Sequence, residues 1–112
     1  MPPRGDVFLA IRDPTRRAIL DLLLRGPRNA GNIAAQFPRL TQPGVSRHLK
    51  VLRDSGLVLV TTKAQQRVYT LQPKRLHELE EWIRKYAYDQ IDRLERLADL
   101  VDERPKPKRV TA

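Results

Sequence analysis

The sequence contains no cysteine, and that absence excludes several classes of protein. Disulfide scaffolds, thiolate zinc sites and cysteine nucleophiles all need a cysteine thiol. Long apolar runs are missing too: no stretch approaches the ~18 consecutive apolar residues of a membrane-spanning helix, and the first residues lack the apolar core of a secretory signal. We therefore expect a soluble, intracellular protein of the cytoplasm, with no membrane association.

The chain has 112 residues, of which 40% are hydrophobic, and this is enough for one folded domain with a modest core. Its formal net charge is +9. The charge is unevenly spread: residues 1–72 carry a net +8, residues 73–103 a net −3 and residues 104–112 a net +4. A basic body indicates a polyanion partner, most often nucleic acid, although a solvated arginine-rich surface is the alternative.

Helical spacing of apolar residues and local start and stop signals predict four short helices before residue 57. The starts are marked by Asp6, by Asp13 followed by Pro14, by Asn29, and by Thr41 followed by Pro43. The ends of the last three are marked by Gly26 with Pro27, by Pro38 and by Gly56. The third helix is expected over about 29–37 and the fourth over 41–55.

The period then changes from 3.6 to 2, which predicts strands over 57–62 and 68–71. The five polar residues between them form the connection of a β-hairpin whose turn has no glycine. After Pro73 an apolar stripe at spacings of three or four predicts one uninterrupted helix over about 74–101, ~42 Å long. The basic, proline-rich residues 104–112 are expected to form a disordered tail. The expected domain spans 1–103.

Two helices joined by a short turn and followed at once by a hairpin have the layout of a winged helix-turn-helix. The expected fold class is therefore mainly α with a small β-hairpin, ending in a long C-terminal helix. In such a unit the 41–55 helix enters the major groove and the hairpin acts as a wing. Its polar face and the wing supply the candidate DNA contacts: Thr41, Gln42, Ser46, Arg47, His48, Lys50, Arg53, Lys63 and Arg67. Gln42 and Arg47 suit base edges, and Lys63 and Arg67 flank the hairpin tip, where they suit the backbone.

Three segments carry a resemblance to a known family: DPTRRAILDLL at 13–23, QPGVSRHLKVLRDSGLV at 42–58 and RVYTL at 67–71. In them the chain resembles the ArsR-type winged-helix transcriptional regulators, over about residues 6–101. The resemblance implies a homodimeric repressor that binds an inverted repeat in double-stranded DNA. It also implies a dimer interface made by the first and last helices.

The stripe on the last helix supports that dimer independently, because left alone it would be a long exposed apolar patch. Acid-first pairs such as Glu80 and Arg84 flank the stripe. A symmetric pair of chains would bury it and set two reading helices ~34 Å apart, one turn of DNA. The candidate interface residues are Val7, Phe8, Ile11, Leu79, Ile83, Ala87, Ile91, Leu94 and Ala98.

Metal sensing and catalysis are not expected. Metal-sensing members of the family use cysteines near the reading motif or histidines and acidic residues on the last helix. Here there is no cysteine, and the only histidine of the last helix is His77, near its start. Neither His48 nor His77 has partners for acid–base or nucleophilic chemistry, so the chain is not expected to be an enzyme, and no cofactor is expected.

Several residues keep two interpretations. His48 either contacts DNA or has a purely structural role. Arg16 and Arg17 follow a helix start, where they suit either a phosphate or simple solubility. Trp82 and Tyr86, four residues apart, suit packing or a small-molecule pocket. For the whole chain, we expect a sequence-specific repressor; the alternatives are an architectural DNA-binding protein without sequence preference and a winged-helix module that binds another protein.

Overall fold

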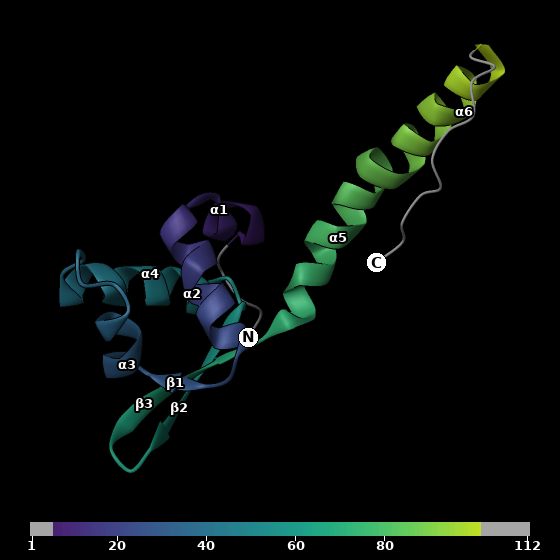
Figure 1. Ribbon diagram of the computed structural model, residues 1–112. Coiled ribbons are helices and arrows are strands. Elements are labelled where there is room, and N and C mark those ends of the chain that lie inside the picture. Colours follow the sequence, from purple (N-terminus) through teal and green to yellow (C-terminus); the bar gives the residue numbers. More distant parts are fainter. Residues whose placement is uncertain (1–5, 102–112) are drawn as a thin grey trace. The chain divides into compact units, whose positions relative to one another are not determined.

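The computed structural model describes residues 6–101, which form helices and one small antiparallel sheet (Figure 1). The chain divides into two compact units, one ending at Leu79 and the other beginning at Glu80, and each is described by itself. The first contains α1 (Val7–Arg12), α2 (Pro14–Leu24), β1 (Arg28–Asn29), α3 (Ala30–Ala35), α4 (Gln42–Asp54), β2 (Val58–Lys63), β3 (Gln66–Leu71), a 3₁₀ turn (Pro73–Arg75) and the start of α5 (Leu76–Arg84). The predicted fold class, mainly α with a winged helix-turn-helix, is confirmed.

All four predicted helix starts are confirmed, because each capping side chain accepts a hydrogen bond from the first turn of its helix. Asp6 accepts from the backbone of Phe8 at 2.8 Å. The caps of the other three helices are Asp13, Asn29 and Thr41, with shortest distances of 2.7, 2.7 and 3.0 Å. These bonds satisfy backbone N–H groups that have no partner within the helix. Helix α3 is shorter than predicted, since it ends at Ala35 and Phe37 lies beyond it.

The carbonyl end of α1 is held by two consecutive arginines of α2. A helix leaves its last four carbonyls without intrahelical partners. Arg16 donates from Nε and Nη2 to two of them at 2.6 and 2.9 Å, and Arg17 donates from Nη1 to the other two at 2.6 and 3.0 Å. The acceptors are, in that order, Ala10, Leu9, Ile11 and Arg12. Neither interpretation of Arg16 and Arg17 from the sequence anticipated this capping role.

The end of α4 fixes where the wing begins. Gly56 adopts φ +79°, a left-handed conformation that favours glycine. Its N–H bonds to the carbonyl of Arg53, and the N–H of Leu57 bonds to the carbonyl of Leu52, both at 3.0 Å. Leu52 and Leu57 are both fully buried. This pair of bonds with an apolar contact is a Schellman motif, which ends the helix at the predicted glycine and turns the chain into β2.

The sheet has three strands in the order β1–β3–β2, all antiparallel. The prediction of a two-stranded hairpin missed β1, in which Asn29 pairs with Val68. It was also wrong about the turn: β2 and β3 extend to the pair Lys63 and Gln66, so the connection has two residues, not five. Those residues, Ala64 and Gln65, have φ of +50° and +67°, as the tight turns of twisted hairpins require. In Figure 1 this hairpin projects from the helices of its unit.

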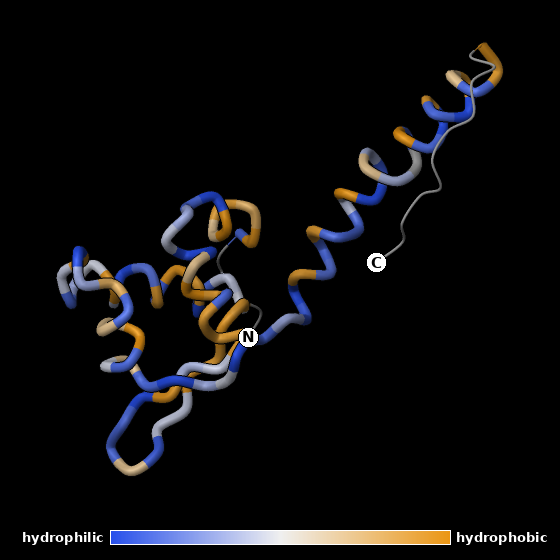
Figure 2. The backbone as a smooth tube through the Cα atoms, in the orientation of Figure 1, coloured by the Kyte–Doolittle hydropathy of each residue, from blue (hydrophilic) through white to orange (hydrophobic). Residues whose placement is uncertain are grey.

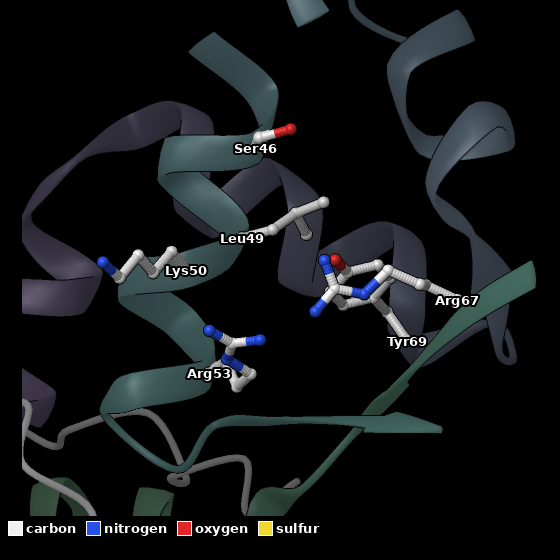
Figure 3. Close-up of a pocket in the computed structure, with 6 residues that line it drawn as sticks. All are labelled: Ser46, Leu49, Lys50, Arg53, Arg67 and Tyr69. Carbon is white, nitrogen blue, oxygen red and sulfur yellow. The ribbon is translucent and has the colours of Figure 1, made fainter. Parts of the chain in front are cut away.

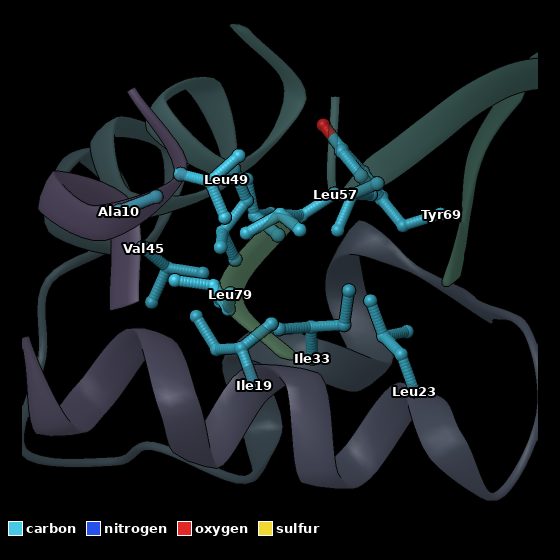
Figure 4. Packing of buried hydrophobic residues seen from close by; sticks show 12 residues of the cluster. Ala10, Ile19, Leu23, Ile33, Val45, Leu49, Leu57, Tyr69 and Leu79 are labelled. Carbon is cyan, nitrogen blue, oxygen red and sulfur yellow. The ribbon is translucent and has the colours of Figure 1, made fainter. Parts of the chain in front are cut away.

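A single apolar cluster holds the first unit together (Figure 4). Every helix and both long strands contribute at least one side chain to it. The buried members are Val7, Ala10, Ile19, Leu23, Ile33, Val45, Leu49, Leu52, Leu57, Val58, Tyr69 and Leu79. Because Val45, Leu49 and Leu52 come from one side of α4, the core fixes the rotation of that helix and therefore which residues face outward.

The second unit is described from Glu80 to Val101 and is helical throughout. The end of α5 leads into a π-helical segment (Lys85–Gln90) and then α6 (Ile91–Val101). The prediction that these residues form one continuous helix was right, but it missed the wider π-helical turns. Those turns do not interrupt the spacing of apolar residues by three or four, so the sequence pattern does not reveal them. Apolar and polar residues alternate along it in Figure 2. None of the described helices combines the length and apolarity that crossing a membrane requires. The predicted tail, 104–112, lies outside the described residues.

Candidate nucleic-acid interface

Helix α4 has one buried side and one exposed polar side. Val45, Leu49 and Leu52 are at most 2% exposed. Gln42, Ser46, Lys50 and Arg53 recur at spacings of three and four on the side of the helix next to this buried side, and all are exposed. A helix that presents amide, hydroxyl, ammonium and guanidinium groups along one face carries the donors and acceptors that base edges and phosphates recognise.

Eight of the nine predicted DNA contacts are exposed. Thr41 accepts the N–H of Gly44 with Oγ1, which leaves its hydroxyl hydrogen free to donate. Gly44 also suits this cap, because a Cβ there would lie only 3.2 Å from Oγ1. The exception is His48, which is half-buried and whose Nδ1 lies 3.3 Å from Nη1 of Arg16.

A hollow of about 210 Å³ lies between α4 and β3 (Figure 3). Its walls are Ser46, Leu49, Lys50 and Arg53 from α4 and Arg67 and Tyr69 from β3. Figure 3 shows the guanidinium groups of Arg53 and Arg67 pointing into the space between helix and strand. Two guanidinium groups across this hollow, with no acidic side chain in its walls, suit an oxyanion such as a phosphate.

The two cations predicted on the wing occupy different places. Lys63 is the last residue of β2, beside the two-residue turn, and is exposed. Arg67 pairs with Thr62 on the opposite strand and lines the hollow against α4. The prediction placed both beside the tip. Since the turn is shorter than predicted, Lys63 lies directly beside it, and Arg67 lies one residue pair further along the hairpin, where it also lines the hollow against α4.

Sequence reasoning missed Tyr69 as part of this surface. The residue is only 6% exposed, and it packs in the core while lining the hollow. A tyrosine in a strand ordinarily indicates packing, and its position beside Arg53 depends on how the strand meets α4. No sequence signal reports that.

The predicted interface residues differ in burial. Val7 and Leu79 are enclosed by the core of the chain's own first unit, at 1% and 7% exposure. Phe8, Ile83, Ile91 and Leu94 are between 42% and 64% exposed. Ala98 is exposed, whereas Ile11 and Ala87 are half-buried. The ring centroids of Trp82 and Tyr86 lie 5.2 Å apart, so these two side chains share a face of the helix.

Among the side chains that the structure describes, there is no group of three or more histidine, cysteine or acidic side chains placed to hold a metal ion. The fold and this surface define a winged helix-turn-helix protein with an exposed polar helix, α4, beside a basic wing. The family model described as bacterial regulatory protein, arsR family, matches residues 13–59. The chain belongs to this family of DNA-binding transcriptional regulators and is not an enzyme.

Individual relatives agree with that assignment. The transcriptional repressor SdpR of Bacillus subtilis is 39% identical over 79 residues, which cover 70% of this chain and 87% of the repressor. The crystal structure of an ArsR family transcriptional regulator is 30% identical, with a TM-score of 0.66 over 79% of this chain and 86% of that one. A second crystal structure, described as a possible transcriptional regulator for arsenical resistance, is 35% identical with a TM-score of 0.66, over 81% and 92% of the two chains.

Proposed function

We propose that this chain is a homodimeric repressor that binds an inverted-repeat operator through the 41–55 helix and the 57–71 wing. The observation that carries the proposal is the orientation of α4. Its apolar side is locked into the core, so its polar side must face outward beside the basic wing. Occupation of an operator by such a dimer would block RNA polymerase sterically. The repressor named among the relatives supports repression over activation.

The surface separates into groups suited to reading and groups suited to gripping. Gln42 and Arg47 can form paired hydrogen bonds with adenine and guanine edges. Arg53 and Arg67 face a common hollow that suits one backbone phosphate, and Lys63 suits a phosphate at the wing tip. Ser46 and Lys50 lie between these groups and fit either role. The arrangement supports sequence-specific binding over purely electrostatic binding, because the neutral amide of Gln42 and the hydroxyl of Ser46 share this face with the cations.

We place the dimer contact on the exposed apolar residues: Phe8, Ile83, Ile91, Leu94 and Ala98. Val7 and Leu79 would support the contact from within the core. Ile91, Leu94 and Ala98 recur on α6 at the spacing of a helix-packing stripe. A symmetric pair buries that stripe in both copies and sets two α4 helices to read two half-sites.

We propose no metal effector. Arsenic and mercury are bound in proteins through thiolates, and this chain supplies none. One of the similar solved structures is described as a possible transcriptional regulator for arsenical resistance, so the proposal depends on this chain's own composition and not on its family. A regulator of this kind acts on the bacterial chromosome, and we therefore place it in the cytoplasm.

Selection of bound sequences from a random DNA pool tests the proposal. The expected result is an inverted repeat with half-sites about 10–11 base pairs apart, bound at least ~10³-fold more tightly than unrelated DNA at the same salt concentration. Tight binding with a ratio below about ten would instead indicate an architectural protein. Absence of measurable DNA binding would indicate a protein-interaction module.

A further inference from the structure

The guanidinium group of Arg16 is fixed by the helices behind α4. Its Nε and Nη2 donate to the carbonyls of Ala10 and Leu9, at 2.6 and 2.9 Å. Its remaining nitrogen, Nη1, lies 3.3 Å from Nδ1 of His48 and 4.0 Å from a carboxylate oxygen of Asp13. The side chain is only 13% exposed. Contacts with α1 and α2 therefore fix the position of the Arg16 guanidinium group, and this position determines which hydrogen bond His48 of α4 can form with it.

This contact decides which ring nitrogen of His48 carries the proton. A guanidinium group has five N–H donors, no acceptor, and does not lose its proton in proteins. A hydrogen bond between Nη1 and Nδ1 is therefore donated by Arg16 and accepted by a lone pair on Nδ1. The neutral ring must then carry its proton on Nε2, since each tautomer has one donor nitrogen and one acceptor nitrogen.

The opposite nitrogen, Nε2, is not fully enclosed by the protein. No described residue hydrogen-bonds to Nε2 of His48. Among described side chains, the only buried polar atom without a partner is Nε of Arg28, so Nε2 is not a buried, unpartnered atom. His48 directly follows Arg47, at the border between the buried and exposed sides of α4.

We propose that Arg16 is a positioning residue for His48: it holds the neutral ring in the tautomer with the proton on Nε2, so that Nε2–H donates to a phosphate of bound DNA. This inference rests on the proposed function. It assigns His48 a contact that depends on a residue of α2 outside the DNA-facing surface. It also makes His48 a neutral donor, which distinguishes it from the lysine and arginine contacts around it.

A neutral hydrogen-bond donor and a cation affect the salt dependence of DNA binding differently. A lysine or arginine that neutralises a phosphate releases counterions, so its removal lowers the slope of log affinity against log salt by roughly one unit. A neutral N–H strengthens binding without changing that slope. Its loss costs about threefold to tenfold in affinity, the range of one ordinary hydrogen bond.

The tautomer is measured directly by two-dimensional ¹⁵N NMR of the imidazole ring in the wild-type chain, at alkaline pH and without DNA. The expected spectrum has protonated Nε2 and unprotonated Nδ1 for His48. In Arg16→Lys, which cannot keep both carbonyl bonds and the Nδ1 bond, this signature should weaken toward a mixture. Arg17→Lys is the matched control, because Arg17 caps the same helix without contacting His48. A wild-type ring protonated on Nδ1 overturns the proposal.

The contact to DNA is tested by two substitutions of His48 that leave Arg16 intact. Glutamine places its amide near the position of Nε2, whereas asparagine places it near Nδ1. His48→Asn should bind the selected operator at least threefold more weakly than His48→Gln, with the salt slope unchanged in both. Equal affinities, or a slope reduced by about one unit in both variants, overturn the neutral-donor contact. If wild type binds no DNA, the proposed function and the phosphate contact fail together, while the NMR result decides the tautomer separately.

Discussion

Nη1 of Arg16 lies 3.3 Å from Nδ1 of His48, and through this pair one guanidinium group joins the carbonyl end of α1 to α4. Arg16 and Arg17 together satisfy all four terminal carbonyls of α1, a helix of six residues. A helix that short has little stability of its own. Its position depends on these bonds and on Val7 and Ala10, both buried in the core.

The first prediction concerns this cap. Arg16→Met should lower the free energy of unfolding by about 1–3 kcal/mol, because a part-buried carbonyl, that of Ala10, and an exposed one, that of Leu9, lose their donors while much of the side-chain volume remains. Urea denaturation measures the change. Arg47→Met is the matched control, since Arg47 is exposed, and it should change stability by less than about 0.5 kcal/mol. Equal losses in the two variants would show that the capping bonds contribute nothing.

The second prediction concerns acid. Partial burial acts to raise the pKa of Asp13, but hydrogen bonds from the backbone N–H groups of Arg16 and Thr15, with smaller electrostatic interactions with His48 and Arg16, outweigh it, so the pKa lies below the ordinary aspartate value. The folded state therefore favours the carboxylate. Its stabilisation is present above the pKa of the unfolded chain, about 3.9, and is lost as the pH falls through the lower folded pKa.

Asp13→Asn keeps a capping oxygen and removes the charge. The substitution should lower the melting temperature at pH 7, and the difference from wild type should shrink as the pH falls below about 4. Thermal unfolding followed by circular dichroism between pH 7 and pH 2.5 measures this. A difference that stays constant down to pH 2.5 would mean that the charge of Asp13 does not stabilise the fold.

Local signals were enough to predict much of this fold. Asp13 with Pro14 and Thr41 with Pro43 mark helix starts within a few residues of sequence, and Gly56 marks an end in the same way. The spacing of Val45, Leu49 and Leu52 then fixed the outward face of α4. The parts of the fold that could not be predicted depend on contacts between residues far apart in the sequence. Strand β1 has two residues, too few for a periodic pattern, and exists because β3 lies beside it.

The errors at the site have the same origin. The polar run from Lys63 to Arg67 predicts a five-residue connection, with no glycine to mark a tighter turn, and therefore places Arg67 beside the tip. Ala64 and Gln65 nevertheless adopt positive φ, because the pairing of β2 with β3 continues to Lys63 and Gln66. The role of Arg16 depends on α1 folding back beside α2 and on α4 packing against it. Both contacts join helices that are separate in the sequence, and no local sequence signal predicts which helix packs against which.

The third prediction concerns the junction of α4 and the wing. Gly56→Ala should destabilise the fold by about 1–2 kcal/mol, because a non-glycine residue in the left-handed conformation carries that cost. Gly31→Ala is the control: it lies within α3, and its added Cβ would meet only Asn29 Oδ1 at an ordinary 3.4 Å. That substitution should be neutral or stabilising. Urea denaturation measures the free energy of unfolding of both variants. Equal changes would show that the left-handed conformation of Gly56 does not require glycine.

The fourth prediction concerns assembly. At micromolar concentration the protein should have twice its 13.0 kDa chain mass in light scattering. Ile83→Glu and Leu94→Glu place a charge in the proposed interface and should give monomers that also lose operator binding. Gln90→Glu adds the same charge at an exposed polar position and should remain dimeric. A wild-type mass near 13.0 kDa would exclude the proposed dimer.

The fifth prediction separates sequence reading from charge. Arg47→Ala and Gln42→Ala should lower the ratio of operator affinity to non-specific affinity, because each removes a paired base contact worth about 1–3 kcal/mol. Lys63→Ala, at the wing tip, should weaken both affinities alike and reduce the salt slope by roughly one unit. Fluorescence anisotropy with operator and scrambled DNA at several salt concentrations measures both quantities.

The same measurements distinguish the roles of Arg47 and Gln42. Because Arg47 carries a charge, a reduced salt slope with an unchanged ratio in Arg47→Ala would assign it to a phosphate and leave base reading to Gln42 and Ser46. Gln42 is neutral, so Gln42→Ala should change the ratio and not the slope. If neither substitution changes the ratio, and the wild-type ratio is itself below about ten, then binding is electrostatic alone and the protein is architectural.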